Sequence, residues 1–237
     1  MRPTLIFIPG NICDARLWRE LPDIPGWSRV DAPPLGQASI SAMATAVLAK
    51  LHGPVIPVGF SMGGIVALEM ARQAPERVKA MVLIDTNAGA DLPERAALRP
   101  IQQLRVQNGE MATIIADELK PAYLAAANRN DAALKQLLFD MAMDLGEDIF
   151  LAQSEALRMR ADLGPVLDTF AGPIAVMCGA EDSLCPPEWH EAMARRARDT
   201  RLTIIPGAGH MLPLEQPSAF SAALTAWLDD YAGEFHV

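Results

Sequence analysis

A serine flanked by glycines stands between two runs of different periodicity. Residues 59–63 read G-F-S-M-G, after an apolar run at 55–58 and before a helix-like run at 64–71. A serine on a tight turn from strand to helix takes a strained backbone conformation that lifts its hydroxyl clear of the sheet. Glycine is needed two residues before and two after it, because a Cβ there would collide with the neighbouring chain. The pattern predicts Ser61 as a nucleophile for acyl transfer.

The predicted helix after this turn supplies a second chemical group. Its first backbone N–H groups have no partner inside the helix, and its dipole is positive at this end. We expect the N–H of Met62 to bind the oxyanion that forms when the Ser61 hydroxyl attacks a carbonyl. The hydroxyl also needs an imidazole to accept its proton and a carboxylate to orient that imidazole.

Four histidines could serve as this base, and three of them stand in unsuitable places. His52 precedes a turn on the wrong side of its strand, and His190 lies inside a predicted helix. His236 is one residue from the end of the sequence. His210 follows the last predicted strand, and ligand sites of open parallel sheets gather at the carboxyl ends of strands. We therefore expect His210 to be the base.

Short apolar runs alternate with helical patterns over most of the chain, which is typical of an α/β fold with a parallel sheet covered on both faces. Strands are predicted at 4–8, 28–32, 55–60, 80–85, 174–178 and 202–205. Helices are predicted beside them at 40–51, 63–73, 188–197 and 217–231. Ser39, Pro187 and Pro217 stand where helix starts favour such residues.

The pattern changes between Asn87 and Pro165, where strand-like runs vanish and apolar residues recur at helical spacing. We expect an all-helical insertion after the fourth strand. Breaks are predicted at Pro100, Gly109, Pro121 and Gly146, which leave about four helices near 94–108, 110–120, 132–145 and 148–160. The expected division is a core of 1–87 and 165–237 with a helical cap of 88–164.

Composition limits the partners and the compartment. A net charge of −9 argues against binding to nucleic acid or to an anionic membrane surface. The first apolar run is too short for a signal peptide, and no run approaches the ~18 residues of a membrane span. Cys13, Cys178 and Cys185 are widely spaced, which favours free thiols in a reducing compartment. We expect a cytoplasmic protein that acts on a small molecule, with no membrane or nucleic acid as partner.

The chain resembles a compact α/β-hydrolase of the esterase and C–C hydrolase type over nearly its full length. The segments that carry the resemblance are I-F-I-P-G-N at 6–11, D-A-P-P-L-G-Q-A-S at 31–39, the elbow at 59–63, G-A-E-D at 179–182 with Pro186, and G-A-G-H at 207–210. The resemblance implies Ser61 as nucleophile, Asp182 as acid and His210 as base, in the chain order that this fold uses. It implies no cofactor and no metal.

Asp85 is an alternative acid, because it also ends a strand and some relatives place their carboxylate there. Asp182 is favoured, since its strand directly precedes the strand that leads to His210. Asp85 would otherwise cap a turn or helix at the mouth of the insertion. Both aspartates fall between Ser61 and His210, so chain order does not separate them.

The chain departs from the family pattern in two places. The second oxyanion donor is implied to be the N–H of Asn11, but Pro9-Gly10 stands where most relatives have His-Gly. A hydrogen bond that usually braces this loop is therefore missing, although any residue at position 11 supplies an N–H. Relatives usually have an antiparallel hairpin before the strand that leads into this loop, whereas three residues precede the predicted strand 4–8 in this sequence. We expect six parallel strands, with 4–8 inside the sheet between 28–32 and 55–60.

The expected reaction is hydrolysis of a small or medium ester with an apolar acyl part through an acyl-enzyme. The same residues would serve a C–C bond hydrolase of a keto acid, which needs a cationic pocket, a cofactor-free perhydrolase or a thioesterase. A binding protein on this fold is the non-catalytic alternative. Arg158 and Arg160 could meet a substrate carboxylate or be solvated. Residues that could line the pocket or pack helix on helix are Met111, Ile114, Ile115, Tyr123, Leu138, Met141, Met143, Phe150, Leu157 and Met159.

Overall fold

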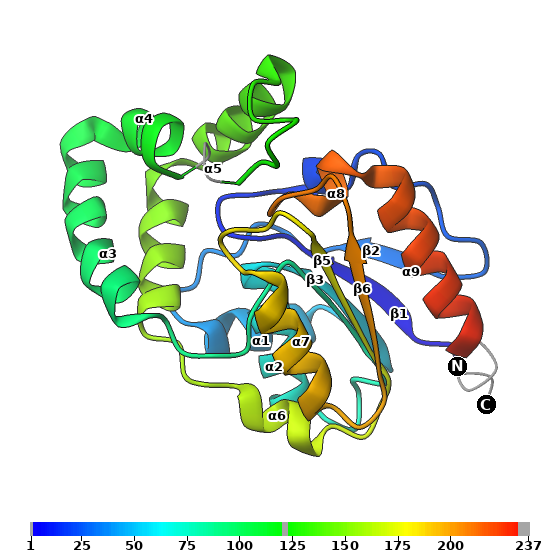
Figure 1. The fold of residues 1–237 in the computed structure, drawn as a ribbon. Coiled ribbons are helices and arrows are strands. Elements are labelled where there is room, and N and C mark those ends of the chain that lie inside the picture. The colour runs from blue at the N-terminus through cyan, green and yellow to red at the C-terminus, as the bar shows by residue number, and fades with distance from the viewer. Residues whose placement is uncertain (1, 120–122, 232–237) are drawn as a thin grey trace.

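The computed structural model describes residues 2–119 and 123–231 and places six parallel strands in one sheet (Figure 1). The strands are β1 Thr4–Ile8, β2 Arg29–Asp31, β3 Val55–Phe60, β4 Met81–Ile84, β5 Ile174–Gly179 and β6 Thr200–Ile205. Their order across the sheet is β2-β1-β3-β4-β5-β6. This confirms the predicted sheet, with β1 inside it. The order reverses between β1 and β3, and open α/β sheets bind ligands at such a point.

Helices cover both faces of the sheet (Figure 1). They are α1 Ile40–Ala49, α2 Met62–Gln73, α6 Gly164–Thr169, α7 Pro187–Arg196, α8 Leu212–Glu215, α9 Pro217–Tyr231 and a 3-10 helix at Ala15–Trp18. In β1, Ile6 and Ile8 join the apolar core beneath α1 and α2, while Leu5 and Phe7 join the core beneath α9. Burial on both faces explains why the strands read as continuous apolar runs.

The predicted helix starts at Ser39, Pro187 and Pro217 are confirmed. The Ser39 hydroxyl accepts a hydrogen bond from the Ala42 N–H at 3.2 Å, and the two prolines are the first residues of α7 and α9. The 3-10 helix, α6 and α8 were not predicted. Each is four to six residues long, which is too short to establish a helical period in the sequence.

The segment between β4 and β5 contains α3 Pro93–Arg105, α4 Met111–Thr113 and α5 Ala132–Arg158, with wide helical turns at Val106–Glu110 and Ile114–Leu119. Gly109 and Gly146 interrupt the helical backbone with φ of 87° and 79°. The break predicted at Gly146 is confirmed, because the backbone is non-helical there and α5 consists of two helical stretches joined by a kink. One expectation was wrong: Pro100 lies within α3 and does not break it, at an exposed position where solvent can reach the backbone. Pro121 lies outside the described residues.

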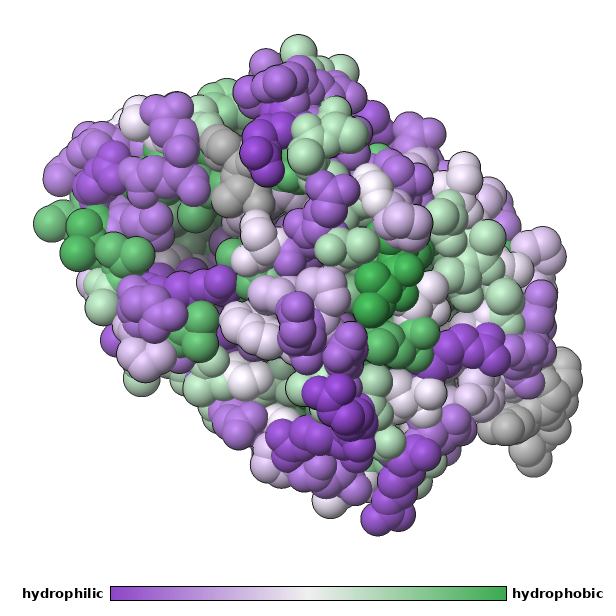
Figure 2. All heavy atoms as spheres, viewed as in Figure 1, coloured by the Kyte–Doolittle hydropathy of each residue, from purple (hydrophilic) through white to green (hydrophobic). Residues whose placement is uncertain are grey.

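These helices form a small apolar core of their own. It contains Val106, Met111, Ile114, Ile115, Ala142 and Phe150, and it includes Ile12 from the loop after β1. α3 packs along α5 but has no buried residue (Figure 1). Its Leu98, Ile101 and Leu104 are 54%, 57% and 59% exposed, and Figure 2 shows apolar atoms at the edge where α3 lies. In the described ranges, every helix is too short or too polar to cross a bilayer.

Candidate active site

The turn from β3 to α2 holds Ser61 in a strained backbone conformation, with φ of 51° and ψ of −116°. The flanking glycines are sterically required. A Cβ on Gly59 would lie 2.3 Å from the Gly63 carbonyl oxygen, and a Cβ on Gly63 would lie 2.1 Å from the Ile8 carbonyl oxygen. The close approach of β1, β3 and α2 therefore fixes where the Ser61 hydroxyl points.

The end of β4 also supports this turn. The Ser61 N–H donates to the Ile84 carbonyl at 2.8 Å, and the Thr86 hydroxyl donates to the Ser61 carbonyl at 2.7 Å. The Thr86 N–H in turn donates to Nε2 of the buried His190 at 2.9 Å. Burial lowers the pKa of His190 to about 4, so this ring is neutral and accepts the bond. His190 therefore supports the backbone beside Ser61. The sequence did not indicate this role, because His190 stands within a predicted helix.

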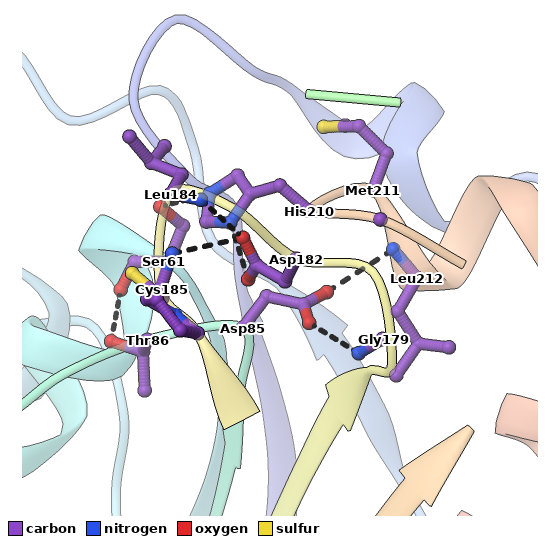
Figure 3. Close-up of polar contacts among 12 residues, drawn as sticks. Ser61, Asp85, Thr86, Gly179, Asp182, Leu184, Cys185, His210, Met211 and Leu212 are labelled. Carbon is purple, nitrogen blue, oxygen red and sulfur yellow. Dashed lines mark hydrogen bonds and ion pairs between the residues drawn. The ribbon is translucent and has the colours of Figure 1, made fainter. Parts of the chain in front are cut away.

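Ser61, His210 and Asp182 meet at the carboxyl ends of β3, β5 and β6 (Figure 3). Nε2 of His210 lies 3.0 Å from the Ser61 Oγ, and Nδ1 lies 2.8 Å from Oδ2 of Asp182. A neutral ring protonated at Nδ1 donates to the carboxylate and accepts from the hydroxyl. The rings of Phe60 and Tyr123 flank the imidazole.

Asp182 is buried with its charge compensated. Its Oδ1 accepts hydrogen bonds from the N–H groups of Leu184 at 2.8 Å and Cys185 at 2.9 Å (Figure 3). Burial by itself raises the pKa of Asp182, but the His210 ring and these N–H groups outweigh it and hold the pKa below its usual range. The carboxylate is therefore ionised at neutral pH beside the imidazole.

Asp85 occupies a different position from Asp182. Its carboxylate accepts from the Gly179 N–H at 2.9 Å and the Leu212 N–H at 3.1 Å, which ties the ends of β4 and β5 to the start of α8 (Figure 3). Complete burial and the nearby charge of Asp182 raise the pKa of Asp85 well above its usual range. The geometry places Asp182, and not Asp85, against His210.

Asn11 and Met62, the two expected oxyanion donors, line the same cavity of about 270 Å³ as Ser61. Met62 is the first residue of α2, so its N–H has no acceptor within the helix. Asn11 lies in a tight turn that the Cys13 N–H closes by donating to the Gly10 carbonyl at 3.2 Å. Ile12 in this turn has φ of 46°, which is a strained conformation for a β-branched residue.

A residue that the sequence did not indicate braces this turn. Gln153 of α5 is 1% exposed, and its Oε1 accepts from the Ile12 N–H at 2.7 Å. Its Nε2 donates to the Leu35 carbonyl at 2.9 Å. The insertion thus supplies a hydrogen bond to the loop that lacks the usual His-Gly. Gln153 stands in an ordinary helical run, so nothing local in the sequence marks it.

Some of the residues expected to line the cavity do so, and others lie elsewhere. Tyr123, Phe150 and Leu157 line it, whereas most of the others pack within the apolar cores and Met143 and Met159 are exposed. Arg160 lines it as well, with its guanidinium paired to Asp91 at 2.8 Å. Arg158 instead pairs with Glu155 at 2.6 Å outside the cavity.

Asp182, Cys185 and His210 bring three possible metal-ligand atoms within 4.8 Å of one another. The carboxylate and the imidazole already bond to each other, and burial raises the pKa of the Cys185 thiol to about 12. The thiol is therefore protonated at neutral pH, which makes it a poor metal ligand and a poor nucleophile.

Comparison with known proteins identifies the family of the chain. The model of the alpha/beta hydrolase family matches residues 5–223. A pimeloyl-[acyl-carrier protein] methyl ester esterase of Neisseria meningitidis is 30% identical over 84% of this chain and 64% of its own length. One from Pectobacterium carotovorum is 26% identical over 94% and 93% of the two chains. A thermophilic esterase from Thermogutta terrifontis superposes with a TM-score of 0.84 at 26% identity, over 99% of this chain and 91% of that one. The chain belongs to the alpha/beta hydrolase family.

Proposed function

We propose that the chain is a serine carboxylesterase in which Ser61 is the nucleophile, His210 the base and Asp182 the acid. The observation that carries this proposal is the continuous contact from Ser61 Oγ through His210 to Asp182, with Ser61 lining a cavity. Strain at Ser61 supports the assignment, because strained backbone persists where the surrounding structure enforces it and clusters at functional sites.

The reaction proceeds in two steps. The Ser61 hydroxyl passes its proton to Nε2 of His210 as Oγ attacks the carbonyl carbon, and Asp182 stabilises the imidazolium. The backbone N–H groups of Asn11 and Met62 bind the oxyanion, and its collapse expels the alcohol, which takes the proton from His210. Water, deprotonated by the same ring, then attacks the acyl-enzyme and releases the acid.

A small or medium ester with an apolar acyl part fits the volume of the cavity and its apolar wall of Met62, Ile65, Phe150 and Leu157. In this proposal residues 88–164 act as a cap over a core of 1–87 and 165–237. The names of the curated relatives make methyl esters of acyl chains the first substrates to test. The small-molecule partner, the cytoplasmic location and the lack of a cofactor remain predictions.

The test is a panel of p-nitrophenyl and methyl esters of increasing acyl length. Ser61→Ala should fold normally and lose turnover by about 10⁴-fold or more. Ser41→Ala, at an exposed serine on α1, is the matched control and should keep full activity. A fluorophosphonate probe should label the wild-type protein at Ser61. Ester turnover that survives in Ser61→Ala would overturn the assignment.

A further inference from the structure

Positive charge is concentrated at the cavity of a chain whose net charge is −9. The charged side chains that line the cavity are Asp91, Arg95, Arg99, Glu118 and Arg160. The remaining lining residues are neutral. The charged residues that line the cavity of the proposed esterase therefore sum to a positive charge, whereas the chain as a whole is negative.

The two carboxylates at this wall are already engaged. Glu118 forms an ion pair with Arg105, which lies outside the cavity lining. The side chain of Asp91 is 1% exposed and lies between Arg99 at 2.6 Å and Arg160 at 2.8 Å. One carboxylate thus compensates two guanidinium groups, and a net positive charge remains beside the cavity.

The guanidinium of Arg160 is occupied by hydrogen bonds within the protein. Its guanidinium also donates to the carbonyls of Gly89 at 3.0 Å and Leu157 at 3.3 Å, and the side chain is only 4% exposed. Arg99 uses Nε and Nη2 on Asp91, which leaves Nη1 without a partner in the described part of the chain. Its donors are therefore available to a ligand in a way that those of Arg160 are not.

Arg95 is compensated least. It donates from Nη2 to the Leu184 carbonyl at 3.0 Å and lies over the Trp189 ring at 5.8 Å. Within residues 2–119 and 123–231 it forms no ion pair with a carboxylate. Arg95 and Arg99 are four residues apart on α3, so both side chains share one face of the helix, and both line the cavity.

We propose that Arg95 and Arg99 form a subsite for an anionic group, a carboxylate or a phosphate, on the substrate. This inference rests on the proposed esterase function. A guanidinium group at a partly desolvated cavity wall binds carboxylate or phosphate strongly, since it offers parallel N–H donors. Met62, Ile65 and Leu157 line the same cavity and suit an apolar chain between the ester and the anion. The favoured substrate is an ester with an apolar chain and an anionic far end.

The inference is tested with matched substrates that differ in charge. Monomethyl esters of linear dicarboxylic acids are compared with the dimethyl esters of the same acids. A third series carries a phosphate monoester in place of the free carboxylate and distinguishes the two anions. Wild-type kcat/KM should favour at least one anionic series at one chain length by ~10- to 100-fold, the scale of a charged hydrogen bond. Equal rates on charged and neutral esters would overturn the inference.

Charge-removing variants locate the subsite. Arg95→Gln and Arg99→Gln should each remove most of this preference through a rise in KM, and Arg99→Lys should restore part of it. Arg158→Gln removes a cavity-external arginine of α5 and should leave the preference unchanged. A loss that is equal on charged and neutral esters would mean that Arg95 acts through the Leu184 turn that holds Asp182, and would refute the subsite.

A binding measurement separates this inference from the proposed function. Isothermal titration of Ser61→Ala protein with a monomethyl dicarboxylate should give heat that Arg95→Gln in the same background abolishes. If the wild-type protein hydrolyses no ester but this binding is seen, the esterase proposal fails and the anion subsite stands. If esters are hydrolysed but the binding does not depend on Arg95 or Arg99, the subsite fails alone.

Discussion

Two buried aspartates follow the neighbouring strands β4 and β5, and their hydrogen-bond partners give them different roles. One carboxylate oxygen of Asp182 contacts the imidazole, and the other accepts from backbone N–H groups. Both carboxylate oxygens of Asp85 accept from backbone N–H groups. In the proposed mechanism, only Asp182 can fix the tautomer of His210.

Substitution by asparagine separates these tasks. Asp182→Asn should lower kcat on a p-nitrophenyl ester by about 10⁴-fold, because the amide favours the wrong tautomer of His210. Asp85→Asn should mainly destabilise the fold, by ~1–3 kcal/mol, since the amide NH₂ would face a backbone N–H that has lost its acceptor. Steady-state kinetics and urea unfolding measure the two effects. The reverse pattern would make Asp85 the acid.

His190 should make stability depend on pH. Its pKa is about 4 in the folded protein against an ordinary 6.5, so the unfolded chain takes up a proton first as the pH falls. The stabilisation is complete above pH 6.5 and is lost as the pH falls to about 4, by roughly 3 kcal/mol. Urea unfolding from pH 7.5 to 4.5 measures it. His190→Gln keeps an acceptor for the Thr86 N–H and should flatten the profile. Equal slopes for both proteins would contradict this role.

The site residues that could be predicted from the sequence are those whose constraints come from nearby positions. The glycines around Ser61 mark a turn whose sterics lie within a few residues of the serine and in the adjoining strand. The positions of Asp85 and Asp182 depend on how the loops after β4 and β5 fold, and both aspartates follow a strand. Chain order could not decide between them, and the three-dimensional contact with His210 does.

Among the elements, α5 controls the loop that carries Asn11, because Gln153 holds the Ile12 N–H. Gln153→Leu should lower kcat by ~10- to 100-fold and change KM little, since the loop would no longer present the Asn11 N–H to the oxyanion. Ester kinetics over a full substrate range separate the two constants.

The control lies on the same helix. Gln136 is exposed, and among the described residues its side chain bonds to Asp140 of the same helix, so Gln136→Leu should keep wild-type kinetics. Gln153→Glu retains an acceptor for the Ile12 N–H and should recover part of kcat relative to Gln153→Leu. A rise in KM with unchanged kcat would show that Gln153 shapes the pocket and does not position the loop.

Elements with long, regular patterns were predictable, and those set by distant contacts were not. All six strands and the helices α1, α2, α7 and α9 follow from periodicity, because each is buried against its neighbours at regular positions. Pro100 was predicted as a break in the insertion, but α3 continues through it at an exposed position. The brace from Gln153 spans 141 residues, and no local pattern encodes such a contact.

At the scale of the molecule, Asp91 and Arg160 join the two ends of the helical segment. They lie 69 residues apart, and both side chains are almost fully buried. Asp91→Asn should destabilise the protein by ~3–5 kcal/mol, because it leaves the buried guanidinium of Arg160 and the partly buried one of Arg99 without a carboxylate. Hydrogen exchange should show the loss of protection first in 93–158, before the strands.

A surface pair provides the comparison. Asp168 and Arg196 are 48% and 40% exposed, so Asp168→Asn should cost at most about 1 kcal/mol. If Asp91→Asn costs no more than this, or if exchange rises uniformly across the sheet, the buried pair does not join the segment to the core.

The absence of any buried residue in α3 has a consequence for how a ligand arrives. α5 is anchored on both sides of Gly146, by Leu138 and Met141 before it and by Gln153 after it. We expect α3 to move outward while α5 stays in place, a movement that would break the polar contacts of Arg95 with the Leu184 carbonyl, Arg99 with Asp91 and Gln103 with Ser154. Entry would then cost little apolar contact, and the turn at Ile12 would keep its shape while α3 is displaced.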